Sequence, residues 1–195
     1  MKLILNSLLL LALVACKSSS ITPQKDSTLD VLDTAEKQAT TSQNETSNPT
    51  GMLLGIQDRA ALEREPHDYW FNDNYDSYEM DTEAVAQLQP LLEDVKIKAF
   101  MGTWCGDSQY GVPAFYKIMD EAKFDYNNLT LITVTRNKDT PEKLEEGLNI
   151  IRVPTFIFYK DGKELGRYVE YARESLEKDM ITILSGEPYK HSYED

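Results

Sequence analysis

One stretch decides the fold: Ile97-Lys98-Ala99-Phe100-Met101-Gly102-Thr103-Trp104-Cys105-Gly106-Asp107-Ser108. Its first five residues belong to a strand predicted over residues 95–101, and a helix is predicted over residues 109–123, where apolar residues recur at helical spacing. A cysteine between a strand and a helix lies near unpaired backbone N–H groups and the positive end of the helix dipole. Both stabilise a thiolate, which is the nucleophilic form of the sulfur. Cys105 is therefore the candidate reactive residue.

The regular pattern begins at residue 82 and alternates helices with strands. Pro90 and Pro113 are expected to kink or shorten their helices, whereas Thr140 and Pro141 are suited to start one. The element order combines a parallel crossover half with an antiparallel hairpin half, and it predicts an α/β fold in which helices flank a central mixed sheet. Helices are predicted over residues 82–94, 109–123, 141–148 and 174–184, and strands over residues 95–101, 129–135, 154–159 and 164–170.

Three motifs in this order resemble the thioredoxin family. Trp104-Cys105-Gly106-Asp107-Ser108 resembles the active-site turn Trp-Cys-Gly-Pro-Cys, and residues 151–158 resemble the segment that carries a cis-proline. Residues 160–163 match the family's hairpin turn, so that the resemblance covers about residues 82–185. It implies a thioredoxin-like fold with Cys105 as nucleophile and Trp104 beside it. It also implies a cis Val153–Pro154 bond that brings Val153, Pro154 and Thr155 beside the sulfur to bind a partner peptide.

The departures from the family's pattern restrict the chemistry. Ser108 replaces the second cysteine, and the other cysteine of the chain is Cys16, so the domain has one thiol and forms no internal disulfide. Asp107 replaces the usual proline, and its carboxylate opposes the helix dipole and is expected to raise the pKa of the thiol. Ser108 is expected to compensate in part by donating a hydrogen bond to the thiolate.

Two further positions differ from the family. Ala99 stands where the family has a buried acid six residues before the nucleophile, and Glu170 aligns with a glycine of the partner-facing loop. Both changes fall on the proton-transfer and docking parts of the site that the resemblance implies.

The N-terminus predicts export and lipidation. Residues 1–15 have a positive charge at Lys2 and continue as an almost wholly apolar run too short to span a bilayer, as in a secretory signal peptide. The run ends Leu13-Val14-Ala15-Cys16, which resembles the lipobox of bacterial lipoproteins and implies cleavage before Cys16 and a palmitate-bearing anchor on it. Lys17 is not the aspartate that retains many lipoproteins in the inner membrane. The resemblance therefore favours the cell envelope, on the periplasm-facing side of the outer membrane.

The remaining organisation follows from composition. Residues 16–50 are polar and are predicted to be a disordered tether behind the lipidated cysteine. Residues 51–81 form an N-terminal extension, with a short helix ending near Pro66 and an aromatic stretch that packs on the core. Residues 82–188 form the thioredoxin-like domain, and a charged tail follows it.

Composition excludes several classes of function. The formal net charge of −13 argues against nucleic-acid binding, which needs lysine and arginine against phosphates. His67 and His191 are far apart and lack the spacing of zinc ligands, so neither a metal nor another cofactor is expected.

The sequence is compatible with three functions. The first is monothiol thiol–disulfide exchange, of the reductase or isomerase type, on envelope proteins that carry disulfides or mixed disulfides. The second is a non-catalytic binding or assembly module on the same fold. The third is a monothiol glutaredoxin-like carrier of an iron–sulfur cluster, because Cys105-Gly106-Asp107-Ser108 also resembles Cys-Gly-Phe-Ser.

Overall fold

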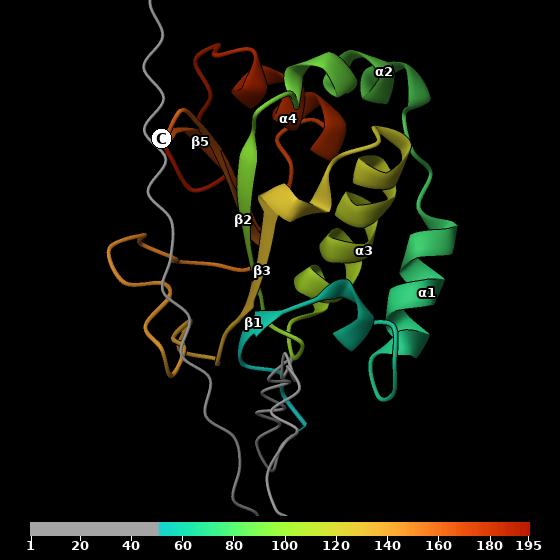
Figure 1. Cartoon of the computed structure of the whole chain (residues 1–195), viewed down its shortest axis with the longest axis vertical. Helices are drawn as coiled ribbons and strands as arrows, with labels where there is room; N and C mark the ends of the chain where they lie inside the picture. The colour runs from blue at the N-terminus through green and yellow to red at the C-terminus, as the bar shows by residue number, and fades with distance from the viewer. Residues whose placement is uncertain (1–50) are drawn as a thin grey trace, which may run out of the picture. The chain divides into compact units, whose positions relative to one another are not determined.

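The computed structural model describes residues 51–195 (Figure 1). The predicted signal peptide, Cys16 and the tether lie outside the described residues. Within residues 51–195, no helix combines the length and the apolar character that crossing a membrane requires.

A five-stranded mixed sheet forms the centre of the fold. The strand order is β1-β3-β2-β4-β5, with β2 and β3 parallel and the other neighbouring pairs antiparallel. This confirms the predicted combination of a parallel crossover and an antiparallel hairpin, whereas β1 at the sheet edge was not predicted. The strands are β1 (Gly55–Gln57), β2 (Lys96–Met101), β3 (Leu129–Thr133), β4 (Thr155–Lys160) and β5 (Lys163–Val169).

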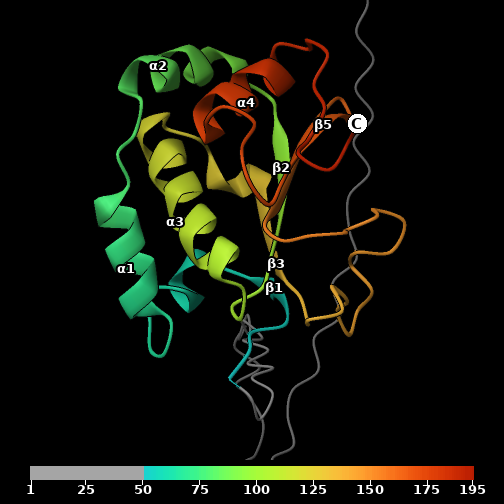
Figure 2. The same cartoon turned by 180° about the vertical axis from the view of Figure 1, so that it is seen from behind.

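The four α-helices of residues 51–195 lie on one side of this sheet, as Figures 1 and 2 show from opposite directions. Alternate side chains of β2, at Ile97, Ala99 and Met101, join the helices in one large core, because successive residues of a strand face opposite sides. The helices are α1 (Asp68–Ser77), α2 (Thr82–Leu91), α3 (Gly106–Glu121) and α4 (Leu176–Leu184), with 3₁₀ turns η1 (Arg59–Ala61) and η2 (Tyr126–Asn128).

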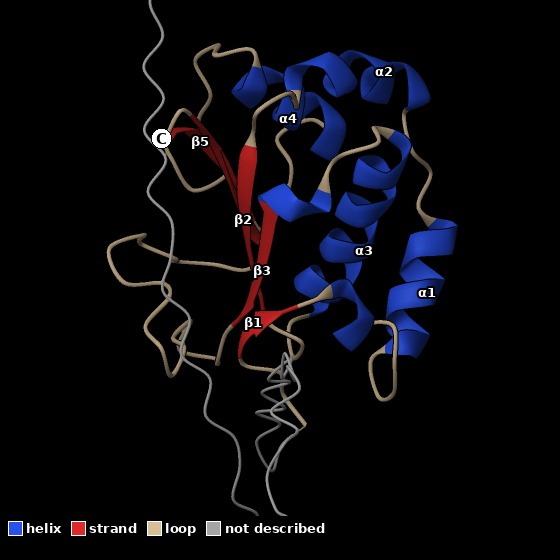
Figure 3. Ribbon diagram, in the orientation of Figure 1, coloured by secondary structure: helices blue, strands red, loops and turns tan. Residues whose placement is uncertain are grey.

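The opposite face of the sheet is covered by a loop segment between β3 and β4, drawn in tan in Figure 3. Phe100 and Ile157 point to this side and form a smaller core with Leu144, Leu148 and Trp104. Since the helices share the other face, the expectation of helices flanking the sheet holds on one side only.

The predicted helix over residues 141–148 is wrong, because this segment forms turns. Thr140 does accept the Leu144 N–H on its hydroxyl, as a helix cap would, at 2.8 Å. However, Lys143 and Gly147 adopt left-handed backbone angles, which interrupt any helical run. The Glu145 carboxylate also turns back to the Thr140 N–H, at 3.0 Å.

The ends of three other helices also differ from the predicted ones. α2 ends at Leu91 rather than residue 94, and Asp94 adopts a left-handed backbone angle, with φ 61°, which interrupts a helical run. α3 begins at Gly106, directly after Cys105, and continues through Pro113. In the N-terminal extension, the predicted short helix is only η1, and the longer helix α1 follows Pro66.

Candidate active site

Cys105 is the N-cap residue of α3. Its backbone is extended, with φ −98° and ψ 123°, and its N–H donates to the Gly102 carbonyl at 2.9 Å. Its own carbonyl accepts the Gln109 N–H at 2.9 Å, so the cysteine closes the turn and opens the helix. The side chain is half-buried and takes no part in capping. The sulfur therefore stands at the positive end of a 16-residue helix.

The Cys105 sulfur contacts the backbone of Val153, the residue before Pro154. The Cys105 thiol donates to the Val153 carbonyl, with 3.3 Å between Sγ and oxygen. The Val153–Pro154 peptide bond is cis, as predicted from the resemblance. Pro154 packs on α3 at Gly111, where a Cβ would lie 3.2 Å from the proline Cγ. Thr155 is buried, and its hydroxyl donates to the Arg152 carbonyl at 2.7 Å. Of the predicted partner-binding residues, Val153 contacts the sulfur, and Pro154 and Thr155 follow it in the chain.

Trp104 packs on the face of the sheet opposite the helices. Its indole N–H donates to the Val134 carbonyl at 2.9 Å, and the Arg136 guanidinium lies over its ring at 4.9 Å. The ring packs so closely on Gly102 that a Cβ there would lie 2.5 Å from it. Trp104 therefore holds the active-site turn in place.

Ser108 lies under the turn and is wholly buried. Its hydroxyl oxygen accepts the Gly102 N–H at 3.2 Å. The predicted hydrogen bond from Ser108 to the thiolate stays a prediction for the ionised state of Cys105. Ser108, which replaces the resolving cysteine, therefore fixes the backbone of Gly102 through this hydrogen bond.

A support from the N-terminal extension was missed by sequence reasoning. The Asn74 amide of α1 donates to the Gln109 carbonyl at 3.1 Å, and the Gln109 side chain donates to the Thr103 carbonyl at 2.8 Å. Thus α1 is linked to the turn that carries Cys105. No residue pattern near Asn74 signals this contact, because it depends on the crossing of α1 and α3.

Two carboxyl groups accompany the thiol. The exposed Asp107 places Oδ2 3.8 Å from Cys105 Sγ. Glu170 has a left-handed backbone, with φ 64°, which accounts for the glycine that the family has here. Burial, and then the Asp107 charge, raise the pKa of Glu170 above its ordinary value. The Arg152 guanidinium, 3.7 Å from the Glu170 carboxylate, opposes this rise.

The position that the family gives to a buried acid is apolar. Ala99 lies in the middle of β2, is buried, and pairs with Leu131 on one side and Phe156 on the other. The sheet beneath the turn therefore offers the thiol no carboxylate at this position.

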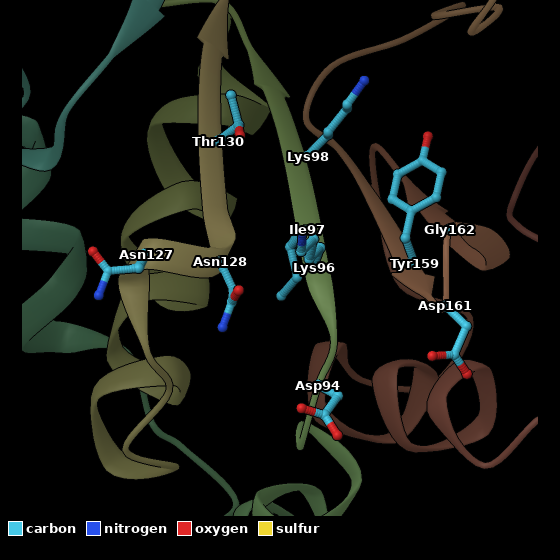
Figure 4. Close-up of a pocket in the computed structure, with 10 residues that line it drawn as sticks. All are labelled: Asp94, Lys96, Ile97, Lys98, Asn127, Asn128, Thr130, Tyr159, Asp161 and Gly162. Atoms are coloured by element: carbon cyan, nitrogen blue, oxygen red, sulfur yellow. The ribbon is translucent and has the colours of Figure 1, made fainter. Parts of the chain in front are cut away.

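The described residues contain no group of histidine, cysteine or carboxylate side chains that could hold a metal ion. A cavity of about 770 Å³, shown in Figure 4, lies at the start of β2 and so at the opposite end of that strand from Cys105. None of the predicted site residues lines it. The lining residues are Asp94, Lys96, Ile97, Lys98, Asn127, Asn128, Thr130, Tyr159, Asp161 and Gly162.

Fold and site together define a protein of thioredoxin-like architecture with a single-thiol turn. The chain belongs to the thioredoxin family, since a family model described as Thioredoxin matches residues 56–183, well over half of its length. The predicted thioredoxin-like fold is thereby confirmed, and at a coarse level it is consistent with thiol–disulfide exchange.

Individual relatives are distant. The thioredoxin of Gallus gallus is 24% identical over 99 residues, which cover 51% of this chain and 89% of that protein. A thioredoxin-like protein of Acanthamoeba polyphaga mimivirus is 26% identical over 82 residues, and the chain spans only 57% of its length. A Pseudomonas aeruginosa protein of unknown function is similar in structure, with a TM-score of 0.52 at 16% identity over 67% of this chain and 93% of that one. This likeness concerns the fold alone.

Proposed function

We infer that the protein carries out monothiol thiol–disulfide exchange through Cys105. The observation that carries this inference is the contact of the Cys105 thiol, at the N-terminus of α3, with the Val153 carbonyl. A sulfur in this place can meet a disulfide in an extended peptide that pairs with the backbone at Val153, as an added strand does.

The exchange step conserves electrons within the reacting sulfurs. Cys105 loses its thiol proton to water, and the thiolate forms a bond to one sulfur of the partner disulfide. The partner's S–S bond breaks, and its leaving thiolate takes up one proton. The product is a mixed disulfide between Cys105 and the partner.

Resolution must come from outside the turn, because Ser108 carries no sulfur. A second thiol of the partner, or a small external thiol, attacks the mixed disulfide and releases Cys105. This favours isomerisation of wrong disulfides and reduction of mixed disulfides over net reduction by a dithiol.

Isomerase activity tests this function. A small protein with scrambled disulfides is incubated in a glutathione buffer with the full chain carrying Cys16→Ser, so that Cys105 is its sole thiol. We expect faster recovery of the native pairing than with buffer alone, and no acceleration by the matched Cys16→Ser, Cys105→Ser chain. Equal rates for both chains would refute an exchange function on protein substrates.

The place of action follows from the N-terminal motif. We propose that Cys16 is lipidated and that residues 17–50 tether the domain to a membrane of the cell envelope, where oxidised partners occur. Metabolic labelling with palmitate tests this, with Cys16→Ser as the control. Label on Cys16 and its loss in the variant support the anchor, and an unlabelled chain that fractionates with soluble proteins contradicts it.

A non-catalytic binding module is the second candidate. It is favoured by the apolar Ala99 beneath the turn, where the family's acid would assist proton transfer. The isomerase assay separates the two, because a binding module gives the same result with and without Cys105.

A further inference from the structure

Residue 170 has a costly backbone for the side chain it carries. A φ of 64° is accessible to glycine without penalty, but other residues adopt it less readily. The strand end around it is firmly held: the Glu170 N–H donates to the Pro154 carbonyl at 2.7 Å, and the Tyr168 hydroxyl donates to the Glu170 carbonyl at 3.2 Å. Because glycine would adopt this backbone more readily, the glutamate at this position indicates a role for its side chain.

The backbone contact places Glu170 directly beside the thiol's own loop. Pro154, which accepts its N–H, follows the Val153 whose carbonyl receives the Cys105 thiol. From the other side, Asp107 brings a second carboxylate to 3.8 Å from the sulfur. Glu170, directly after β5, and Asp107, at the start of α3, thus both lie around the turn that carries Cys105.

The charges around Glu170 are of both signs. Asp107 of α3 repels its carboxylate, whereas Arg152 ahead of β4 and Lys138 after β3 attract it. The Glu170 side chain is partly buried, with 18% of its surface exposed, and the Arg152 guanidinium lies 3.7 Å from its carboxylate. The backbone contact with Pro154 sets Glu170 beside the loop whose Val153 carbonyl receives the thiol, so a charge on Glu170 is placed to act on Cys105 as well as on Asp107.

We propose that Glu170 is a positioning residue for the Cys105 thiol, whose carboxylate, held beside Asp107, sets the pH at which Cys105 becomes the reactive thiolate. This rests on the exchange function inferred above and adds the element that regulates it. Ala99 leaves no acid beneath the sulfur. The negative charges that act on thiolate formation are therefore those of Asp107 and Glu170. An ionised Glu170 restrains thiolate formation, and the restraint is relieved when it is protonated or neutralised.

The test measures the rate of Cys105 alkylation by iodoacetamide against pH, in the full chain carrying Cys16→Ser. We expect Glu170→Gln to move the midpoint of this profile down by about 0.5 pH unit, and to raise the rate about threefold well below the midpoint. Glu170→Asp, which keeps the charge, should restore a midpoint close to that of the parent. Glu170→Gly should shift it as Glu170→Gln does, since both remove the carboxylate and glycine suits the backbone.

The matched control is Glu187→Gln, which removes the same charge at an exposed residue outside the site. It should leave the midpoint unchanged. An unshifted profile in both Glu170→Gln and Glu170→Gly would overturn the proposal, and so would an equal shift in Glu187→Gln, which would indicate net charge alone. Alkylation needs no disulfide, so a chain that fails the isomerase assay still gives a clear answer about Glu170.

Discussion

At the scale of single residues, the active-site turn depends on the absence of one side chain. Gly102 directly follows β2 and accepts the Cys105 N–H on its carbonyl, while its own N–H donates to the Ser108 hydroxyl. The Trp104 ring occupies the space where any Cβ of residue 102 would stand. Glycine is therefore required here for the close approach of the indole.

Gly102→Ala should displace the Trp104 ring and break its hydrogen bond to the Val134 carbonyl. We expect a loss of about 1–3 kcal/mol in the free energy of unfolding, as for other overpacked sites. Urea denaturation and the change in tryptophan emission measure the two effects. Gly106→Ala is the control, because no atom lies within 4 Å of its Cβ position, and a destabilisation equal to that of Gly102→Ala would contradict the account.

His67 gives a residue-scale dependence of stability on pH. It is buried at the start of α1, its Nε2 has no hydrogen-bond partner, and burial lowers its pKa below the ordinary value. The folded state therefore prefers the neutral ring, while the unfolded chain takes up a proton near pH 6.5. The stability that the neutral ring provides is complete above that pH and is lost as pH falls from there to the lower folded pKa.

We expect His67→Phe to flatten this part of the profile of unfolding free energy against pH, measured by urea denaturation between pH 4 and pH 8. His191→Phe is the comparison, since His191 lies near the exposed Glu194 in the tail. An unchanged pH profile in the His67 variant would show that another group governs it.

At the scale of elements, a charged centre at Asp120 joins several segments to α3. The Asp120 carboxylate of α3 accepts from Arg59 at 2.6 Å, from Tyr75 at 2.7 Å and from Tyr126 at 2.6 Å. Burial alone would raise the pKa of Asp120, but these hydrogen bonds outweigh it and hold the pKa below the usual value. η1, α1 and η2 are thus held to α3 at one point.

Asp120→Asn should weaken all three contacts and lower the free energy of unfolding by about 2 kcal/mol. Chemical denaturation measures this, with the exposed neighbour Glu121→Gln as control. Because the stabilising charge is lost on protonation, the parent should also lose this contribution as pH falls below about 4, whereas the Asn variant should not. Equal free energies of unfolding for the Asp120→Asn and Glu121→Gln chains would contradict this role of Asp120.

Elements also mark where sequence reasoning succeeds. The strands β2, β4 and β5 and the hairpin at Asp161 were predicted because their signals are local: apolar runs, a proline and an Asp-Gly turn. The segment over residues 141–148 has a good capping residue in Thr140, yet Lys143 and Gly147 take left-handed angles there. Local propensity alone could not reveal that packing of Leu144 and Leu148 against the sheet would prevail.

At the scale of the whole molecule, the architecture is predictable and the surroundings of the thiol are less so. The order of motifs gave the sheet and the nearness of Cys105 to Val153. The role of α1 in supporting the turn, and the meeting of Glu170 with Asp107, depend on contacts between distant segments. Such contacts leave no periodic trace in the sequence.

The central claim is that Cys105 exchanges disulfides, and mixed-disulfide formation tests it most directly. The reduced full chain carrying Cys16→Ser is mixed with glutathione disulfide at neutral pH, quenched with acid at short times and weighed by intact mass spectrometry. We expect one glutathione adduct on the folded protein, none on the Cys105→Ser chain, and release of the adduct by a second thiol. A folded protein that forms no adduct, or does so only after unfolding, would contradict the claim.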